Sequence, residues 1–229
     1  MESKGTTLKA LCAEQGSPYH EVCFDTDQVA MIRQPLADPT FYKAHTPYVY
    51  CGLASDVHPF GRSFLYTKNG AYIFNCQSYQ NYNHTGLQEC LSNYVASRRE
   101  RMFKTYIEEE CIFLGGMHIE KTPEGDLVPP SPNFGHFIFE YLNRFAIFDL
   151  HGLTHKLPVV IYENLPERWI GFLELLGISR DRLIRIPEIE TPAFRKVWVS
   201  SAPIIVAWMA NSAFGAKACI GCGSACCRP

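Results

Sequence analysis

The sequence predicts an α/β protein in which an N-terminal region with a β-hairpin precedes a lobe of alternating strands and helices. Its 229 residues can bury a sizeable core, and 47% apolar against 19% charged residues is typical of a globular chain. Apolar and polar residues alternate on both sides of Asn69-Gly70, which indicates the hairpin. From Cys111 to Ile186, short β-forming runs alternate with apolar patterns of helical period, which indicates the lobe.

The first forty residues are rich in Gly, Pro, Asp and Thr and show little periodicity. We expect them to be irregular and only partly ordered. From Tyr48 onward the pattern favours strands, and Gly61 is expected to mark a turn. The run SFLYTKNGAYIFN predicts a hairpin, because Asn-Gly suits the type I′ turn, which needs positive φ at both central residues.

A long amphipathic helix is expected after the hairpin, because apolar residues recur at helical spacing opposite the polar run SRRER. We interpret the polar face as solvated, although Arg98, Arg99 and Arg101 could instead meet a phosphate or an anionic lipid surface, which would allow peripheral membrane association. The apolar stripe consists of Leu87, Leu91, Tyr94, Val95, Met102, Tyr106 and Ile107.

The lobe begins with a short apolar strand, CIFLGG, which ends at Gly115-Gly116. A polar, Pro-rich loop then leads to PNFGHFIFEYLNRF, where a helix is expected with Asn133 as its N-cap. The run Leu157–Tyr162 is typical of a strand that is buried on both faces.

A second helix is expected after that strand, with its end at Gly177. Asn164 and Glu167 have the spacing of a capping box, and Pro166 stands in the first turn, where its missing N–H costs little. Arg182–Ile186 then returns as the next strand.

The order strand, helix, strand, helix, strand implies a parallel sheet with right-handed crossovers, that is, one Rossmann-like half. Val197–Ser200 is expected to add a further strand. The pattern divides the chain into an N-terminal region (1–110), the βαβαβ lobe (111–200), and an apolar segment with a Cys-rich tail (201–229).

Three polar residues interrupt the first helix of the lobe. His136, Glu140 and Arg144 lie at i, i+4 and i+8, so they share one face of an α-helix. They start after a strand's carboxyl end, where open parallel sheets bind ligands, and His136 falls in the first turn, which favours anions. The structural alternative is a Glu140–Arg144 pair with a capping histidine, and spacing alone leaves that alternative slightly favoured.

The same block carries a family resemblance. NFGHFIFEYLNRF resembles the asparagine–tyrosine–x–histidine–tryptophan, acidic residue, leucine, arginine block of glycosyltransferase family 61. KLPVVIYENLPERWIGFLELLGISRDRLIRI is similar to the segment that follows that block, and IFLGG fits the strand before it. The resemblance covers roughly Cys111 to Val199, the N-terminal part of the family's pattern.

The resemblance implies an inverting transferase of GT-B type, in which this chain is one Rossmann-like half, moving a sugar from a nucleotide-sugar donor to a glycan or protein acceptor. Bacterial members are associated with capsular and other surface polysaccharide synthesis. It implies no cofactor and no metal, because the nucleotide sugar is a substrate. His136 and Glu140 are the catalytic candidates, since either could accept a proton from an acceptor hydroxyl. Asn133, Gly135 and Arg144 are the substrate-binding candidates.

The sequence also departs from the family. Phe134 and Phe137 replace the usual tyrosine and tryptophan, and the family's second α/β domain, with its histidine–glycine–alanine segment, does not follow. We therefore expect an incomplete enzyme, or an inactive fragment of one. The alternatives are a non-catalytic half-domain that binds glycan or a protein partner, and a metal-binding protein.

The metal alternative rests on the tail, where Cys219, Cys222, Cys226 and Cys227 could supply four thiolates to zinc or an iron–sulfur cluster. A disordered or out-of-frame tail is the alternative interpretation, because adjacent Cys226 and Cys227 suit a single mononuclear metal site poorly. The six scattered cysteines are expected to be buried, reduced thiols.

Charge and hydropathy exclude other classes. A net charge of -2 without a basic block argues against a nucleic-acid binder. The N-terminus lacks the apolar core of a signal peptide, and Asn211, Ser212 and Lys217 break the apolar stretch that starts at Pro203, so no transmembrane segment is expected. The expected compartment is the cytoplasm.

Overall fold

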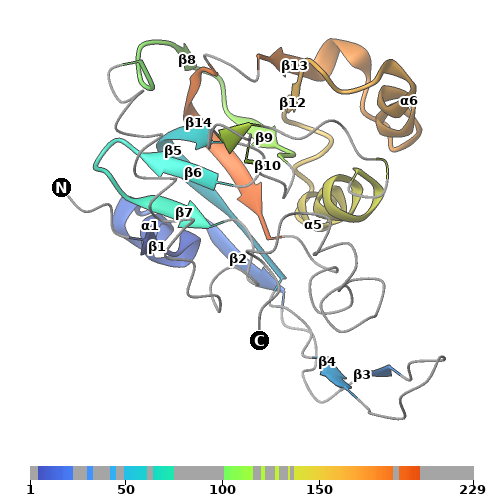
Figure 1. Cartoon of the computed structure of the whole chain (residues 1–229), viewed down its shortest axis with the longest axis horizontal. Helices are drawn as coiled ribbons and strands as arrows, with labels where there is room; N and C mark the ends of the chain where they lie inside the picture. Colours follow the sequence, from blue (N-terminus) through green and yellow to red (C-terminus); the bar gives the residue numbers. More distant parts are fainter. Residues whose placement is uncertain are drawn as a thin grey trace.

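A computed structural model gives the fold (Figure 1). It describes residues 5–22, 30–32, 42–44, 49–60, 64–74, 101–115, 120–121, 127–128, 134, 137–187 and 191–201. The Cys-rich tail, the apolar stretch after Pro203 and the expected turn at Gly61 lie outside these residues.

The described residues form a central mixed sheet of ten strands, in the order β1-β7-β6-β5-β14-β9-β12-β13, with β2 beside β5 and β8 beside β14. Two separate pairs, β3–β4 and β10–β11, are antiparallel. The strands of the central sheet are β1 (Gly5–Thr6), β2 (Tyr19–Val22), β5 (Val49–Phe60), β6 (Phe64–Thr67), β7 (Tyr72–Phe74), β8 (Tyr106–Ile107), β9 (Cys111–Phe113), β12 (Val159–Tyr162), β13 (Leu183–Ile186) and β14 (Ala193–Ser200). Those of the small pairs are β3 (Ala30–Ile32), β4 (Tyr42–Ala44), β10 (Glu120–Lys121) and β11 (Leu127–Val128).

The parallel half of the sheet confirms the α/β prediction. β9, β12 and β13 are parallel neighbours, with Val159 paired to Ile112 on one side and to Leu183 on the other. All four residues of β12 are buried, as expected for a strand covered on both faces. The expected strand near Val197 is β14, which lies parallel to β9 and antiparallel to β5.

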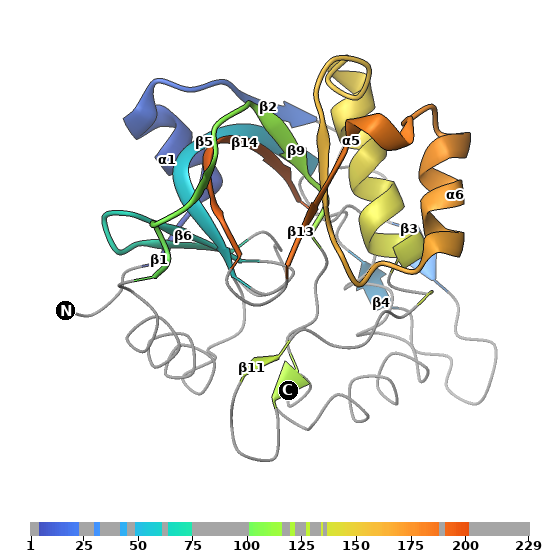
Figure 2. The ribbon, with the colours of Figure 1, turned by 90° about the horizontal axis from the view of Figure 1, so that it is seen from above.

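Helices cover both faces of the sheet (Figure 2). A π-helical segment, η1 (Phe137–Leu142), continues into α5 (Asn143–Leu150), and α5 and α6 (Glu167–Leu175) lie on the same side. They pack on inward-facing residues such as Ile112, Ile161 and Trp198. α1 (Leu8–Gln15) covers the opposite face, over residues such as Ala54 and Val199.

The N-terminal prediction was wrong for residues 5–22, which form β1, α1 and β2. Thr7 caps α1, because its Oγ1 accepts a hydrogen bond from Ala10 N at 3.1 Å. Leu8, Leu11 and Cys12 are buried under β5. Their i, i+3, i+4 spacing is a short helical signal that the Gly- and Pro-rich composition of the surrounding residues obscured.

The predicted hairpin is β6–β7, but its turn differs from the expected type. Gly70 has φ +93°, whereas Asn69 does not have positive φ, so a type I′ turn is excluded. Thr67 N donates to Ala71 O at 2.7 Å, and Gly70 N donates to Thr67 O at 3.0 Å. These bonds close a three-residue loop with glycine in the left-handed position of a G1 bulge.

The expected long helix does not extend to its predicted end. Residues 75–100 lie outside the described part, residues 101–105 form turns, and Tyr106 and Ile107 form β8. β8 pairs in parallel with Ala193 and Phe194 of β14. Tertiary pairing therefore overrides the local helical periodicity in this stretch.

The C-terminal end of α6 is the predicted one, whereas its N-terminal end differs from the prediction. The helix starts at Glu167 with Pro166 as its N-cap, a residue that makes no side-chain cap hydrogen bond. Glu167 instead forms ion pairs with Arg180 and Arg185, at 2.9 and 2.7 Å. The end is the expected one: Gly177 has φ +84°, and Ile178 N donates to Leu173 O, which completes a Schellman motif.

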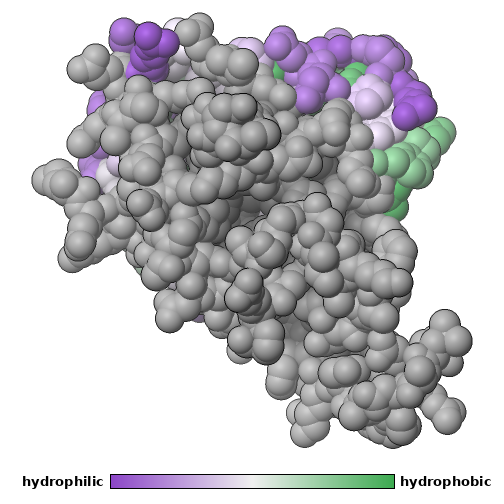
Figure 3. Space-filling model, viewed as in Figure 1, coloured by the Kyte–Doolittle hydropathy of each residue, from purple (hydrophilic) through white to green (hydrophobic). Residues whose placement is uncertain are grey.

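The division at residue 110 remains a prediction, although one sheet contains strands from both sides of it, since β5 adjoins β14 and β14 adjoins β9. At the surface, apolar side chains are exposed at the right of Figure 3, where α6 lies. Leu175 and Leu176 are exposed at this end of α6. Among the described helices, none has both the length and the apolarity that a bilayer span would require.

Candidate functional site

The sequence analysis predicts the functional site at the edge of the sheet formed by the carboxyl ends of the parallel strands. β9, β12, β13 and β14 run in the same direction, so their carboxyl ends lie along one edge of the sheet. η1 and α5 follow β9 in the chain and pack beside this edge (Figure 2). Open parallel sheets bind ligands in this position.

Arg144 is the one predicted site residue whose side chain the structure describes. It is fully buried, and its Nη1 donates a short hydrogen bond to the main-chain oxygen of Gly115, just after β9. The guanidinium cannot lose its proton, so its burial has to be offset by hydrogen bonds. Arg144 therefore ties α5 to the carboxyl end of β9.

The structure does not describe the side chains of the other predicted site residues. Asn133, Gly135 and His136 lie outside the described residues. The backbone of Glu140 belongs to η1, but its side chain is outside the described part. Their assignment stays a prediction.

The helix that carries the block is not a regular α-helix. Residues 137–142 form π turns, with i→i+5 hydrogen bonds, and regular α geometry begins at Asn143. The expected shared face of His136, Glu140 and Arg144 assumed 3.6 residues per turn throughout, and η1 alters that phase between Glu140 and Arg144. π turns occur often at functional sites.

A stack of three rings, His151–His20–Trp198, lies beside α5. The imidazoles of His20 and His151 have centroids 4.4 Å apart with planes at 19°, and His20 lies 5.8 Å from the Trp198 ring with planes at 10°. His20 comes from β2, His151 follows the last residue of α5, and Trp198 comes from β14. Burial, and then the neighbouring His20, lower the pKa of His151.

The residues around the stack are polar and mostly buried. His20, Cys51 and Ser200 occupy one register row across β2, β5 and β14. Within the described residues, Ser200 Oγ and His151 Nε2 are buried without a hydrogen-bond partner. Ser201, the residue after the end of β14, accepts a hydrogen bond at its Oγ from Tyr50 N at 3.0 Å.

Sequence reasoning missed the ring stack. Its members come from three segments that are 131 and 47 positions apart (151 − 20 and 198 − 151). No local spacing links them, and His151 by itself shows no ligand-like pattern. Only the pairing of β2 with β5, and of β5 with β14, brings them together.

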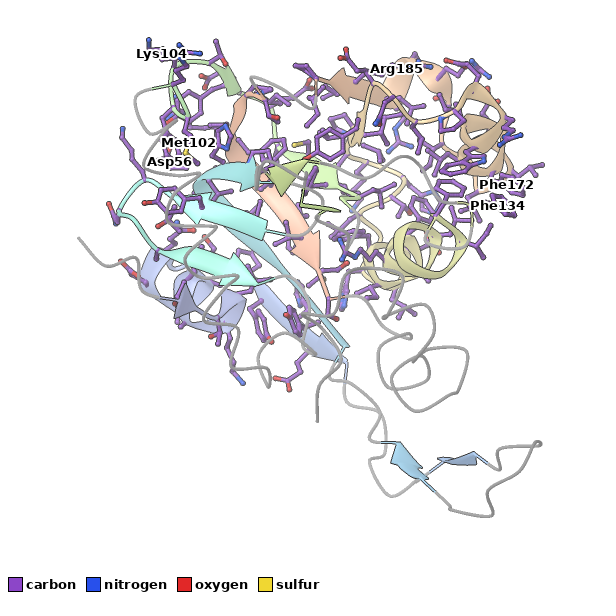
Figure 4. All side chains as sticks on the ribbon, viewed as in Figure 1. Asp56, Met102, Lys104, Phe134, Phe172 and Arg185 are labelled. Carbon is purple, nitrogen blue, oxygen red and sulfur yellow. The ribbon has the colours of Figure 1, made fainter. Side chains whose placement is uncertain are left out.

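An aromatic cluster lies where η1 meets α6 (Figure 4). Phe134 is 48% exposed, and its ring lies 5.8 Å from Trp169 and 5.7 Å from Phe172. The ring of Phe137 stacks on that of Trp169, with the centroids 5.0 Å apart, and Phe137 is buried. Phe134 is therefore partly exposed to solvent while its ring packs on two aromatic side chains of α6, two residues before His136 in the sequence.

The predicted cysteine chemistry is tested in part. Cys12, Cys51 and Cys111 are buried, free thiols, as predicted. The tail cysteines lie outside the described residues. Within the described part of the chain, no three histidine, cysteine or acidic side chains gather closely enough to hold a metal ion.

The described part of the site thus combines a buried cation, two stacked imidazoles and two serine hydroxyls at one edge of the sheet. Such groups form hydrogen bonds with oxygen-rich ligands, and neutral imidazoles accept protons. In comparisons with known proteins, no protein-family model, curated protein or solved structure gave a significant match to this chain.

Proposed function

We propose that the protein is a glycosyltransferase-like lobe of GT-B type that acts on a nucleotide-sugar donor and a glycan or protein acceptor, with inversion at the anomeric carbon. One observation carries the proposal. The helix of the family-like block follows the carboxyl end of β9, and Arg144 of that block holds Gly115 O at this end. The supporting observation is the element order, since β9, η1–α5, β12, α6 and β13 coincide with the resembling segments.

In the proposed reaction, the acceptor hydroxyl attacks the anomeric carbon of the donor while a side chain takes its proton, and the nucleotide leaves with its phosphates. His136 or Glu140 would be this base, since imidazole and carboxylate both accept protons near neutral pH. Asn133 and Gly135 would contact substrate at the first turn of the helix. Arg144 would hold the helix on the sheet, because its guanidinium is buried against Gly115.

The test is a nucleotide-sugar turnover assay on the purified protein with a panel of donors, run with and without glycan acceptors. Either His136→Ala or Glu140→Ala should reduce turnover by about 100-fold or more, the usual effect of removing a general base. His155→Ala is the matched control, because His155 is an exposed histidine outside the block. Undiminished turnover in both block variants would refute the catalytic assignment.

A second candidate function, glycan binding without catalysis, is favoured by the exposed ring of Phe134. A sugar ring can stack its C–H groups on the negative face of an aromatic ring. Binding of oligosaccharides would be followed by NMR titration, with Phe134→Ala and with Leu175→Ala, which removes a non-aromatic apolar side chain at the end of α6 that is 84% exposed. Binding that weakens only in Phe134→Ala supports this function, and equal binding in both variants contradicts it.

A further inference from the structure

β2 is held at the edge of the central sheet by two kinds of contact. Its backbone pairs with β5, from Tyr19 opposite Gly52 to Val22 opposite Val49. Its His20 ring reaches across the row to lie between Trp198 of β14 and His151 at the end of α5. The ring stack is therefore a side-chain link from β2 to α5.

The stack tolerates one proton but not two. Two neutral imidazoles can stack face to face, and the Trp198 ring face attracts an adjacent imidazolium. Protonation of both imidazoles would place two positive charges within a centroid distance of 4.4 Å in a half-buried position. At that separation, like charges repel strongly even in a partly solvated environment.

The acidic groups nearest in the chain and across the sheet are engaged elsewhere. Trp198 Nε1 donates to Glu110 Oε1 at 2.7 Å, and Glu21 beside His20 pairs with Lys9 at 3.1 Å. On α5, Asp149 accepts from Thr154 Oγ1 and lies 3.4 Å from His155 Nε2. Burial raises the pKa of the thiol of Cys51, the residue paired with His20 on β5, and this keeps the thiol neutral. Among the described residues, no carboxylate is bonded to either ring of the pair.

We propose that the stack His151–His20–Trp198 is a proton-operated latch, closed while the histidine pair carries at most one proton and open when both imidazoles are protonated. Opening detaches β2 from α5 and uncovers the row of Cys51 and Ser200 at the carboxyl edge of the sheet. This inference is independent of the proposed function, since it rests on the ring stack and not on the residues of the family-like block.

The direction of the pH effect follows from linkage. The pKa of His151 is lower in the folded protein than its ordinary value of 6.5. The closed form therefore binds fewer protons than the open form below that pH, and acidification favours opening. The latch holds at neutral pH and weakens as the pH falls below about 6.5.

Amide hydrogen exchange tests the latch, with protection at β2 (Tyr19–Val22) compared to that at β9 (Cys111–Phe113). Each variant is compared with wild type at the same pH, so intrinsic exchange rates cancel. At about pH 5, wild-type β2 should be roughly 10-fold or more less protected than β2 of His151→Phe, which keeps the stack but cannot be protonated. At about pH 7.5 the two should agree.

Two further variants secure the interpretation. His155→Gln, which changes an exposed histidine four positions after His151, should behave as wild type at both pH values. If the His151→Phe protein does not fold, His151→Gln is used in its place. The His151→Gln variant should also remove the acid sensitivity of β2. Equal acid sensitivity of β2 in wild type and in the His151 variant overturns the latch. Equal loss of protection in β2 and β9 of wild type overturns it too, because that loss is global unfolding.

Discussion

The backbone of Gly52 lies directly against the thiol of Cys12. A Cβ at position 52 would come within 2.8 Å of Cys12 Sγ, closer than real Cβ atoms approach their neighbours, and within 3.2 Å of Leu8 Cδ2, tighter than most such contacts. Cys12 Sγ in turn donates to Leu53 O at 3.4 Å. The absence of a side chain at Gly52 thus sets how closely α1 packs on β5.

Gly52→Ala should therefore destabilise the protein by about 1–3 kcal/mol, the usual cost of overpacking a closed contact. Urea unfolding measures the change. The matched control is Gly171→Ala on α6, where an added Cβ would meet nothing within 4 Å. It should stabilise by roughly 0.5–1 kcal/mol, because alanine is the better helix former. Equal stability of Gly52→Ala and wild type would mean that α1 can shift away from β5.

Arg144→Met should lower the free energy of unfolding by about 1–3 kcal/mol, because it leaves the buried oxygen of Gly115 without this donor. Lys104→Met, in the exposed turn before β8, is the control and should stay within about 0.5 kcal/mol of wild type. Chemical denaturation measures both. A harmless Arg144→Met would show that Gly115 finds another donor, and that Arg144 does not anchor α5.

The protein should lose stability in alkali. Burial raises the pKa of Cys12 to about 11 and those of Cys51 and Cys111 to about 12, from an ordinary value of 9.0. Above pH 9.0 the unfolded chain therefore binds fewer protons at these thiols than the folded protein, so stability falls as pH rises toward 11–12.

Urea unfolding at successive pH values measures this alkaline loss. Cys111→Ala should reduce the slope of stability against pH above 9.0, because one titrating thiol is removed. An unchanged slope in that variant would contradict the assignment of the loss to buried thiols.

Gly177→Ala should destabilise the protein by about 1 kcal/mol, because φ +84° places a Cβ against the carbonyl oxygen. Gly177→Asn should cost less, since asparagine tolerates left-handed backbone better than alanine does. Thermal or urea unfolding ranks the two variants. The reverse order would show that the Schellman end of α6 is not under this conformational constraint.

The parallel half of the fold was predictable because its signals are local. β12 is a continuous run of β-forming residues, and Gly177 ends α6 where a left-handed residue was expected. β8 was not predictable, because Tyr106 and Ile107 pair with β14 residues that lie 87 positions later in the chain (193 − 106). Their periodicity favoured a helix, and only tertiary pairing shows a strand.

The candidate site likewise has one part that could be predicted from the sequence and one part that could not. Arg144 was found because it belongs to a compact motif with helical spacing, although its role on Gly115 depends on how α5 meets β9. His20 and Trp198 gave no signal, because their contact exists only after two separate strand pairings. Spacing within one helix can suggest a shared face, but it did not indicate the π turns of η1 that change that face.

The position of β14 between β5 and β9 has a consequence for synthesis on the ribosome. β5 and β9 each keep an unpaired edge until residues 193–200 have been made, and the bond from Tyr50 N to Ser201 Oγ spans 151 positions. Pairings over such distances form slowly, and open strand edges invite association with other chains. In the nascent protein, β5 and β9 thus each have an open edge from the time they are made until β14, the last described strand, pairs with both.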